Sequence, residues 1–324
     1  MNFSVQVLGS NSAIPTLTRN PSAHLLKADE RLFLIDCAEG TQLQLRRFKI
    51  HFQRIKHIFI SHLHGDHFYG LIGLLTSFHL LGRKDELHLY AHEALQEIID
   101  IQLKASRTTL VYPVIFHPLT QGNRQQARGK RHEATGKRQQ AIGNSEQLYD
   151  DDAISVFSFP LLHSVPTCGF LFREKPLPRN IRKDVINKLQ VPIEWMTRIK
   201  SGEDYLDDNG KIYSNSEMTQ DPPAPRTYAY CSDTAYSEEI IPYIKGADLL
   251  YHEATFLSDM AATAREKLHS TAAEAATIAN LAGVKKLIIG HFSARYDDPE
   301  ALLTEAREIF PATELAEDGK TFII

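Results

Sequence analysis

The stretch of this chain that decides the fold reads Ser61-His62-Leu63-His64-Gly65-Asp66-His67. It carries four side chains that can bind a metal ion, in the pattern H-x-H-x-D-H. It directly follows the apolar segment His57-Ile58-Phe59-Ile60, which predicts a buried strand. A cluster of imidazole and carboxylate groups at the end of a strand is typical of a hydrolytic site built on two metal ions.

The spacing of these side chains indicates which of them share an ion. Side chains two residues apart along an extended chain point to the same side, so His62 and His64 can hold one ion together. Gly65 then permits a backbone turn that a residue with a Cβ resists, and beyond this turn Asp66 and His67 can face a second ion. Imidazole suits zinc, and a carboxylate among histidines favours hydrolytic over redox chemistry. The alternative interpretation is a polar loop in which histidines happen to cluster.

The bulk composition is that of an ordinary globular protein. The chain has 324 residues, enough for two domains or for one large α/β domain. Its net charge of −4 does not indicate a nucleic-acid-binding protein, so a polyanionic substrate requires local basic patches and metal ions. The three cysteines are far apart and predict neither a disulfide framework nor a zinc ribbon. The sequence shows no secretory signal and no membrane-spanning run, so we expect a cytoplasmic protein.

Strands and helices alternate along most of the chain, a pattern that fits two sheets with helices outside them. We expect strands at residues 3–8, 31–36, 55–61, 87–91, 111–116, 154–159, 169–173, 228–232, 249–252 and 286–290. We expect helices at residues 41–48, 71–81, 93–105, 238–245, 271–281 and 299–309.

Two stretches interrupt this pattern. Residues 121–147 are rich in Arg, Lys, Gln and Gly, and they predict either a solvated loop or a basic contact for a phosphate backbone. Residues 174–225 contain many basic side chains and the only tryptophan, Trp195. They end in the stiff run Asp221-Pro222-Pro223-Ala224-Pro225. We expect this second stretch to be an inserted arm that projects from the main body.

Two metal ions require more ligands than the opening stretch provides. Three later residues each come after a predicted strand, namely His163, Asp233 and His291. A single histidine or aspartate in this position is more often structural than functional. Active sites of layered α/β proteins, however, lie on loops at one edge of the sheets. The repeated placement therefore favours ligand roles for all three residues.

Taken together, these segments resemble the ribonuclease Z family, the tRNA 3′-processing endonucleases of the metallo-β-lactamase superfamily. The H-x-H-x-D-H pattern marks only the superfamily. The Glu-Gly-Thr-Gln, His-Ser-Thr and Gly-His-Phe-Ser-x-Arg-Tyr segments are similar to ribonuclease Z in particular. The resemblance implies one domain over residues 1–324, an α/β fold with a metallo-β-lactamase-like αβ/βα four-layer sandwich and the inserted arm. The matching segments are residues 8–10, 36–42, 61–67, 160–163, 232–234, 252–256, 269–271 and 290–296.

The resemblance implies a metal-binding role for seven residues. One zinc ion would be held by His62, His64 and His163, the other by Asp66, His67 and His291, and both by a bridging Asp233. Asp36 would orient the ligand histidines from behind.

The catalytic residues implied by the resemblance are Asp66, His269, Glu253 and Arg295. Asp66 would orient or deprotonate the attacking water, and His269 would donate a proton to the departing 3′ oxygen. Glu253 would be the hydrogen-bond partner of His269, and Arg295 would meet a phosphate oxygen. Two alternatives stay open: Arg295 and Glu253 form a structural ion pair at the rim of the sheets, or His269 only begins a helix.

The function implied by the resemblance is removal of 3′ trailers from precursor tRNA by a zinc-dependent endoribonuclease, which leaves a tRNA 3′-hydroxyl and a trailer with a 5′-phosphate. We expect two Zn²⁺ per subunit and a homodimer. The rivals are a two-metal phosphodiesterase or sulfatase for small or other nucleic-acid substrates, a thioester or lactam hydrolase, and a tRNA-binding protein with secondary catalysis. A basic arm favours tRNA, because a small substrate needs none, and the complete ligand set favours catalysis.

The expected arm departs from the family pattern at its tip. Family members carry a Gly-Pro-rich tip, whereas this chain reads Val191-Pro192-Ile193-Glu194-Trp195-Met196. The single tryptophan, Trp195, either stacks on an exposed base or ribose or packs the hinge of the arm.

Overall fold

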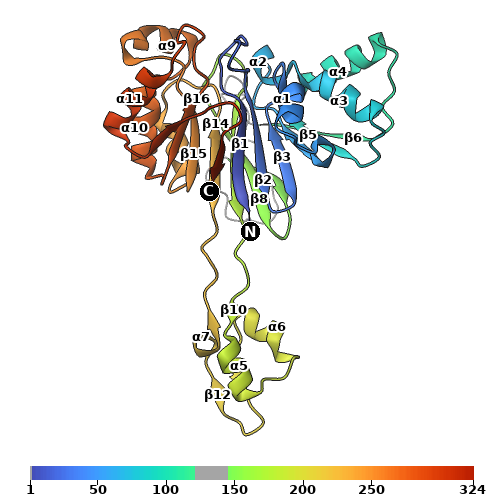
Figure 1. Ribbon diagram of the computed structural model, residues 1–324, viewed down its shortest axis with the longest axis vertical. Coiled ribbons are helices and arrows are strands. Elements are labelled where there is room, and N and C mark those ends of the chain that lie inside the picture. Colours follow the sequence, from blue (N-terminus) through green and yellow to red (C-terminus); the bar gives the residue numbers. More distant parts are fainter. Residues whose placement is uncertain (1, 121–144) are drawn as a thin grey trace, which may run out of the picture.

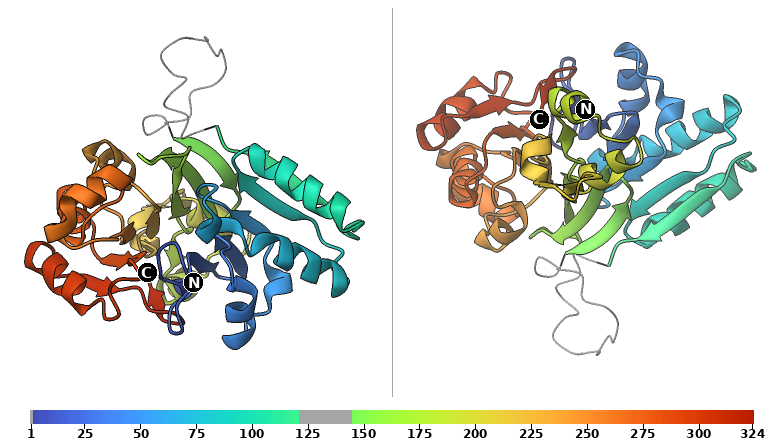
Figure 2. Two further views of the ribbon diagram at one scale, coloured as in Figure 1. Left: turned by 90° about the horizontal axis from the view of Figure 1, so that it is seen from above. Right: turned by 90° about the horizontal axis from the view of Figure 1, so that it is seen from below.

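The structure is a computed structural model that describes residues 2–120 and 145–324. Its main body has four layers: two seven-stranded sheets packed face to face, with helices over both outer faces (Figures 1 and 2). Seen from above in Figure 2, α1 to α4 lie on one outer side and the helices after residue 240 on the other. The predicted αβ/βα four-layer sandwich is confirmed.

The first sheet has the order β18-β1-β2-β3-β4-β5-β6, with parallel pairing from β3 to β6 and antiparallel pairing elsewhere. Its strands are β1 (Phe3–Gly9), β2 (Ala23–Ala28), β3 (Arg31–Ile35), β4 (His57–Phe59), β5 (Leu87–Ala91), β6 (Val114–Pro118) and β18 (Thr321–Ile323). The helices on its side are α1 (Thr41–Arg47), α2 (Gly65–Phe68), α3 (Leu71–Leu80) and α4 (Ala94–Ala105), with a 3₁₀ turn, η1 (Phe52–Arg54).

The second sheet has the order β17-β16-β15-β14-β9-β8-β7, with parallel pairing from β14 to β17 and antiparallel pairing elsewhere. Its strands are β7 (Glu146–Asp150), β8 (Ile154–Pro160), β9 (Cys168–Glu174), β14 (Thr227–Cys231), β15 (Leu249–Glu253), β16 (Leu287–Gly290) and β17 (Thr313–Leu315). The helices on its side are α8 (Ile241–Ile244), α9 (Ala261–Lys267), α10 (Ala272–Ala282) and α11 (Glu300–Ile309), with 3₁₀ turns η2 (Glu238–Ile240) and η3 (Ser258–Met260).

Three apolar clusters hold the four layers together. Between the sheets lie aromatic side chains such as Phe33, Phe59 and Phe172, all fully buried. A second cluster packs α3 and α4 against the first sheet, and a third packs α8, α10 and α11 against the second. Burial of apolar surface is the main force in folding, so these three clusters hold the two sheets and their helices in fixed positions. The rims of both sheets are thereby fixed relative to each other.

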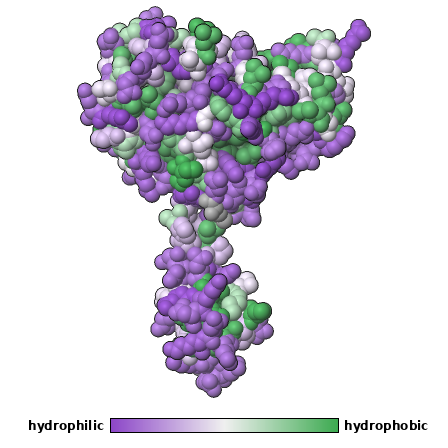
Figure 3. All heavy atoms as spheres, in the orientation of Figure 1, coloured by the Kyte–Doolittle hydropathy of each residue, from purple (hydrophilic) through white to green (hydrophobic). Residues whose placement is uncertain are grey.

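The arm is a small unit between β9 and β14 that stands clear of the main body (Figures 1 and 3). It has its own apolar core around Val191, Ile199, Tyr205 and Met218. Within this unit, Trp195 packs edge-on against Tyr205, with ring centroids 5.2 Å apart. The tryptophan is therefore part of the core of the arm. The elements of the arm are β10 (Asn180–Ile181), α5 (Lys183–Leu189), α6 (Trp195–Lys200), β11 (Tyr205–Leu206), β12 (Ile212–Tyr213), α7 (Asn215–Met218) and β13 (Thr219–Gln220).

Several predicted elements differ in extent. The strand predicted at 55–61 is only β4, because the chain leaves the sheet after Phe59 toward the rim. The helix predicted at 238–245 is split into η2 and α8, with Pro242 in the first turn of α8, where a missing N–H costs nothing. Most of the basic stretch predicted at 121–147 lies outside the described residues, and its last two residues begin β7.

In the main body, β2, β7, β17, β18, α2 and α9 were not predicted, and no element inside the arm was predicted. The segment of β2 reads Ala-His-Leu-Leu-Lys-Ala, which lacks β-branched residues and favours a helix by propensity. Pairing with β1 on one side and β3 on the other overrides this local preference. Across the described parts of the chain, no helix has the length and apolar character needed to span a membrane.

Candidate metal centre

Four strands deliver the predicted ligands to one rim of the main body. His62 and His64 follow β4, and Asp66 and His67 lie in α2, which comes next. The other three predicted ligands come after strands of the second sheet: His163 after β8, Asp233 after β14 and His291 after β16. The structure brings all seven residues together in groups whose ligand atoms lie within 4.8 Å of one another.

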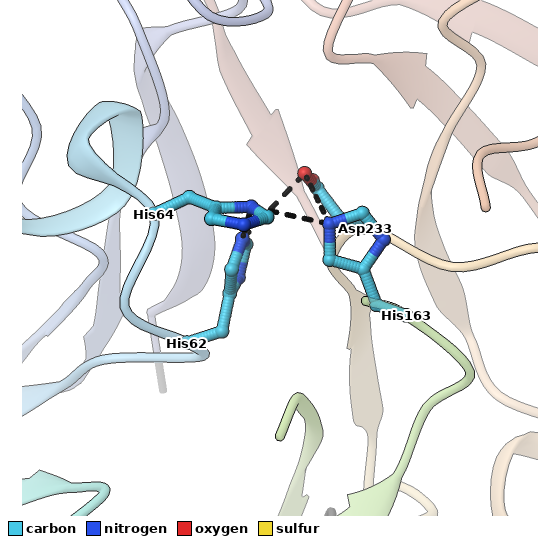
Figure 4. Close-up of side chains that lie close together, drawn as sticks. All are labelled: His62, His64, His163 and Asp233. Atoms are coloured by element: carbon cyan, nitrogen blue, oxygen red, sulfur yellow. Dashed lines mark hydrogen bonds and ion pairs between the residues drawn. The ribbon is translucent and has the colours of Figure 1, made fainter. Parts of the chain in front are cut away.

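The first group contains His62, His64, His163 and Asp233 (Figure 4). Nδ1 of His64 lies 3.1 Å from Nε2 of His62 and 3.2 Å from Nε2 of His163. Oδ2 of Asp233 lies 3.6 Å from Nε2 of His62 and 3.8 Å from Nε2 of His163. The three rings and the carboxylate therefore point their donor atoms at a common space.

The second group contains Asp66, His67 and His291. Oδ2 of Asp66 lies 3.4 Å from Nε2 of His291 and 3.8 Å from Nε2 of His67. The other oxygen of Asp233, Oδ1, faces this group, at 3.2 Å from Nε2 of His291 and 3.4 Å from Nε2 of His67. Asp233 thus directs one carboxylate oxygen to each group.

Hydrogen bonds at the rear of the rings fix the orientation of four histidines of the cluster. Nδ1 of His67 bonds to Asp36 Oδ2 at 2.8 Å, and Nδ1 of His62 lies 3.1 Å from Ser61 Oγ. Nδ1 of His163 donates to the main-chain oxygen of Leu268 at 2.8 Å, and Nδ1 of His291 lies 3.0 Å from Thr255 Oγ1. Each contact leaves Nε2 free to face the cluster, which is the usual support for a metal-binding histidine.

Asp36 accepts several further hydrogen bonds at the rear of the site. Besides His67, it accepts hydrogen bonds from the main-chain nitrogen of Ser61 at 2.7 Å, from Ser61 Oγ at 3.0 Å and from the Tyr230 hydroxyl at 2.8 Å. The residue is fully buried. Asp36 therefore links β3, the histidine run and the second sheet.

Four non-glycine residues around the cluster have a left-handed backbone conformation. Ala13, Asp36, Leu268 and His291 all have a positive φ, between 55° and 61°. Such conformations cost free energy in residues with a Cβ and persist where the surroundings impose them, often at functional sites. Ala13 uses this conformation to donate its main-chain N–H to Asp66 Oδ2 at 2.7 Å.

The electrostatics of the cluster suit a cation. Burial holds the pKa of His62 well below its ordinary value and lowers the pKa of His64 and His163, so these rings are neutral and keep a lone pair. Burial opposes ionisation of Asp233, but the imidazoles of His291 and His67 outweigh burial and hold the pKa of this carboxyl well below its ordinary value. The ionised Asp233 carboxylate therefore faces neutral rings in the first group. In the second group, burial lowers the pKa of His67, but the carboxylates of Asp233 and Asp36 outweigh burial and hold this pKa well above its ordinary value.

The donor set and its unmet bonding fit metal ions. Nε2 of His67 and Oδ1 of Asp233 are buried and have no hydrogen-bond partner. Buried polar atoms without partners are rare, because each loses its hydrogen bonds to water. Imidazole nitrogens and carboxylate oxygens are ligands of zinc and related divalent metals. The cluster thus fits the predicted kind of cofactor.

The predicted catalytic residues differ in how close they lie to this cluster. Nδ1 of His269 bonds to Glu253 Oε1 at 2.8 Å and lies 4.0 Å from Asp233 Oδ2. Burial lowers the pKa of His269, but the carboxylate of Glu253 outweighs burial and raises this pKa to about 9. His269 therefore carries a proton near neutral pH, at the edge of the cluster.

Thr255 connects this pair to a ligand. Its hydroxyl bonds to Glu253 Oε2 at 2.7 Å and lies 3.0 Å from Nδ1 of His291. The sequence analysis assigned no role to Thr255, to Ala13 or to the carbonyl of Leu268. The first lies in a segment that matched the family, whereas the other two act through their backbone, and no side-chain pattern indicates them.

Arg295 lies farther out than the other predicted catalytic residues. Its guanidinium is exposed, donates to Ser293 Oγ at 3.0 Å and lies 5.0 Å above the ring of Phe256. The Phe256 ring in turn lies 6.2 Å from the His269 ring. Glu253 pairs with His269, so the alternative of a structural ion pair between Glu253 and Arg295 is wrong.

The expected role of Gly65 is also wrong. Gly65 begins α2 and is not among the residues with a positive φ. A Cβ here would lie 2.2 Å from Cε2 of Tyr69. Gly65 therefore leaves space for the ring of Tyr69, and the backbone turn does not require a glycine.

The layered fold is that of the metallo-β-lactamase-fold proteins, and the histidine–aspartate rim is compatible with metal binding. A family model described as "Anti-Pycsar protein Apyc1" matches residues 3–111. The ribonuclease Z of Bacteroides fragilis is 43% identical over 317 residues, covering 98% of this chain and 97% of its own. That of Phocaeicola vulgatus is 44% identical over 316 residues, covering 98% of this chain and 96% of its own.

A solved structure gives the same result. The crystal structure of human tRNase Z, short form, has a TM-score of 0.69 and 29% sequence identity, and each chain covers 98% of the other. This chain belongs to the ribonuclease Z family, metal-dependent phosphodiester hydrolases, and the resemblance noted in the sequence is confirmed.

Proposed function

We propose that this protein removes 3′ trailers from precursor tRNA at the candidate metal centre and that it uses two Zn²⁺ per subunit. The observation that carries the proposal is the position of Asp233, whose two oxygens face two separate groups of ligands. His62, His64 and His163 would hold one ion, Asp66, His67 and His291 the other, and Asp233 both. When bound, the ions would lower the pKa of a water molecule and offset charge on the phosphate.

The residues of this chain would divide the chemistry between them. Asp66 is held by the N–H of Ala13 and would orient the attacking water and accept its proton. The water oxygen forms a bond to phosphorus while the bond from phosphorus to the 3′ oxygen of the tRNA breaks. His269, held at Nδ1 by Glu253, would donate the proton on Nε2 to the departing oxygen. The products are a tRNA 3′-hydroxyl and a trailer with a 5′-phosphate.

Arg295 would act at a distance from the reacting atoms. Its exposed guanidinium lies one aromatic ring away from His269, where it would meet a phosphate oxygen of the bound RNA. A role in substrate binding fits this location better than a role in bond cleavage.

The position of the arm supports a homodimer. The arm joins the main body just before β14 begins at Thr227, and Asp233 lies just after β14 ends at Cys231. The arm and the site therefore lie at opposite ends of the same strand. Figure 1 accordingly draws α2 at the end of the main body away from the arm. A tRNA held by one arm is directed away from the site of that chain, so it would meet the site of a second copy.

The rival function is hydrolysis of a small phosphodiester at the same site. The test is incubation of the purified protein with a 3′-extended tRNA precursor and, separately, with bis(p-nitrophenyl) phosphate. We expect cleavage of the precursor that is lost in Asp66→Ala and after metal chelation. Hydrolysis of the small ester with no cleavage of the precursor would favour the rival. Cleavage of tRNA precursors would also imply a cytoplasmic enzyme.

A further inference from the structure

Two short legs, residues 175–179 and 221–226, carry the arm. Both are rich in proline, which occurs at positions 176, 178, 222, 223 and 225. Proline fixes its own φ and keeps the preceding residue extended, so such segments behave as semi-rigid spacers. Figures 1 and 3 show the legs as the narrow connection between the arm and the main body. Because the legs resist bending, the direction of the arm depends on how they are fixed at their root.

Glu174 and Arg226 fix that root. Glu174 is the last residue of β9, and Arg226 directly precedes β14. The guanidinium donates from Nε to Glu174 Oε2 at 2.8 Å and from Nη2 to Oε1 at 2.7 Å. The main-chain nitrogen of Arg226 donates to Oε2 at 2.9 Å. This two-pronged geometry holds the two side chains in one mutual orientation.

The same arginine also reaches the first sheet. Nη1 of Arg226 donates to the main-chain oxygen of Ile324 at 2.8 Å, and the guanidinium lies 5.4 Å above the ring of Phe3. Phe3 begins β1, and Ile324 directly follows β18. A rotation of the legs about their root would therefore break contacts with both sheets.

The environment makes this pair stronger than an ordinary surface ion pair. The side chains of Glu174 and Arg226 are only 12% and 26% exposed. Exposed pairs contribute little, because water screens them and holding two long side chains costs entropy. By contrast, the pair at the far end of the legs, between Arg179 and Asp221, has an aspartate that is 79% exposed. Of these two ion pairs between the legs, the one at the root is therefore the stronger.

We propose that Glu174 and Arg226 are positioning residues that hold the arm in one direction, so that it presents precursor tRNA at a fixed place relative to a cleavage site. This inference rests on the proposed function. Neither the metal centre nor the folded part of the arm, β10 to β13, fixes the direction of the arm, and the inference assigns this role to the root.

The test compares Arg226→Met with Arg226→Lys, which keeps the charge and loses the two-pronged geometry. Arg54→Met is the matched control, because Arg54 pairs with Glu30 on the main body, where the side chains are 47% and 84% exposed. Spin labels at Asp100→Cys in α4 and Lys188→Cys in α5 report the distance between the main body and the arm. The native cysteines are buried and do not compete for the label. Kinetics with a 3′-extended tRNA precursor and with bis(p-nitrophenyl) phosphate complete the set.

We expect Arg226→Met to broaden the distance distribution and to raise KM for the precursor about tenfold, with hydrolysis of the small ester within about twofold of wild type. Arg226→Lys should be intermediate and Arg54→Met unchanged. An unchanged KM or an unchanged distribution in Arg226→Met would overturn the inference. So would an equal loss on both substrates, because the pair would then only stabilise the fold. If the wild-type protein leaves the precursor intact, the proposed function is contradicted. The distance distributions would still test whether Glu174 and Arg226 fix the direction of the arm.

Discussion

Nδ1 of His269 lies 2.8 Å from Oε1 of Glu253, and Glu253 is fully buried. This contact fixes the orientation of the His269 ring, because the carboxylate holds Nδ1 and leaves Nε2 as the other nitrogen. Glu253 also accepts a hydrogen bond from the main-chain nitrogen of Thr234 at 2.8 Å. Through Glu253, His269 is thereby tied to the loop after β14 that carries Asp233.

Glu253→Gln should lower kcat for the tRNA precursor by about 10²-fold, the usual contribution of a positioned general acid. The amide keeps the shape of the side chain but no longer holds a proton on His269. His269→Ala should cost as much, and the double variant little more, since the two residues act as one unit. The measurement is single-turnover cleavage by each of the three variants. Additive losses would contradict a shared role.

We expect two metal ions per chain in the wild type and the loss of both in Asp233→Ala. Asp233 offers one oxygen to each group, whereas His163 belongs to one group alone. His163→Ala should therefore retain one ion. The measurement is metal content by mass spectrometry after dialysis without chelator. Equal metal content in Asp233→Ala and His163→Ala would count against a bridging aspartate.

His24 gives the fold a dependence on pH that is separate from catalysis. The ring is fully buried between the sheets, and burial lowers its pKa from an ordinary 6.5 to about 3. Between these values only the unfolded chain binds the proton, so the free energy of unfolding falls as pH drops below about 6.5. The slope approaches about 1.4 kcal/mol per pH unit for one proton.

His24→Gln should flatten this acid slope, and His51→Gln, at an exposed histidine, should leave it unchanged. The measurement is urea unfolding between pH 4 and pH 7. Most of this interval lies between the pKa of His24 in the folded protein, about 3, and its ordinary pKa of 6.5. An unchanged slope in His24→Gln would mean that other groups dominate the acid response.

A homodimer that uses its arms in trans should show complementation. Asp66→Ala has a defective site and an intact arm, whereas a chain with residues 176–225 replaced by a short Gly-Ser linker has the reverse. A short linker can span the gap, because the two ends of the deletion lie side by side: the main-chain nitrogen of Glu174 donates to the main-chain oxygen of Arg226 at 2.9 Å. Mixed and allowed to exchange subunits, the two inactive proteins should regain activity on the precursor. No gain would contradict cooperation between subunits.

The sequence predicted which side chains come together at the rim better than it predicted the local structure around them. His62, His64, Asp66 and His67 could be identified because ligand chemistry leaves a pattern of side-chain types at fixed spacing. Gly65 fitted the same pattern for the wrong reason, since its Cβ would meet the ring of Tyr69, a contact that spacing does not encode.

The supports of the site were hidden for a related reason. Ala13 and Leu268 act through their main-chain atoms in strained conformations that the surrounding fold imposes. No side-chain type marks such positions. The strand β2 was missed because pairing on both sides, rather than the propensity of its residues, makes it a strand.

The most direct test of the central claim is to map the ends of the products from one 3′-extended tRNA precursor. The account predicts a single cut that leaves a 3′-hydroxyl on the tRNA and a 5′-phosphate on an intact trailer, with no product from Asp66→Ala. A cyclic phosphate on the tRNA, or stepwise release of single nucleotides, would contradict it.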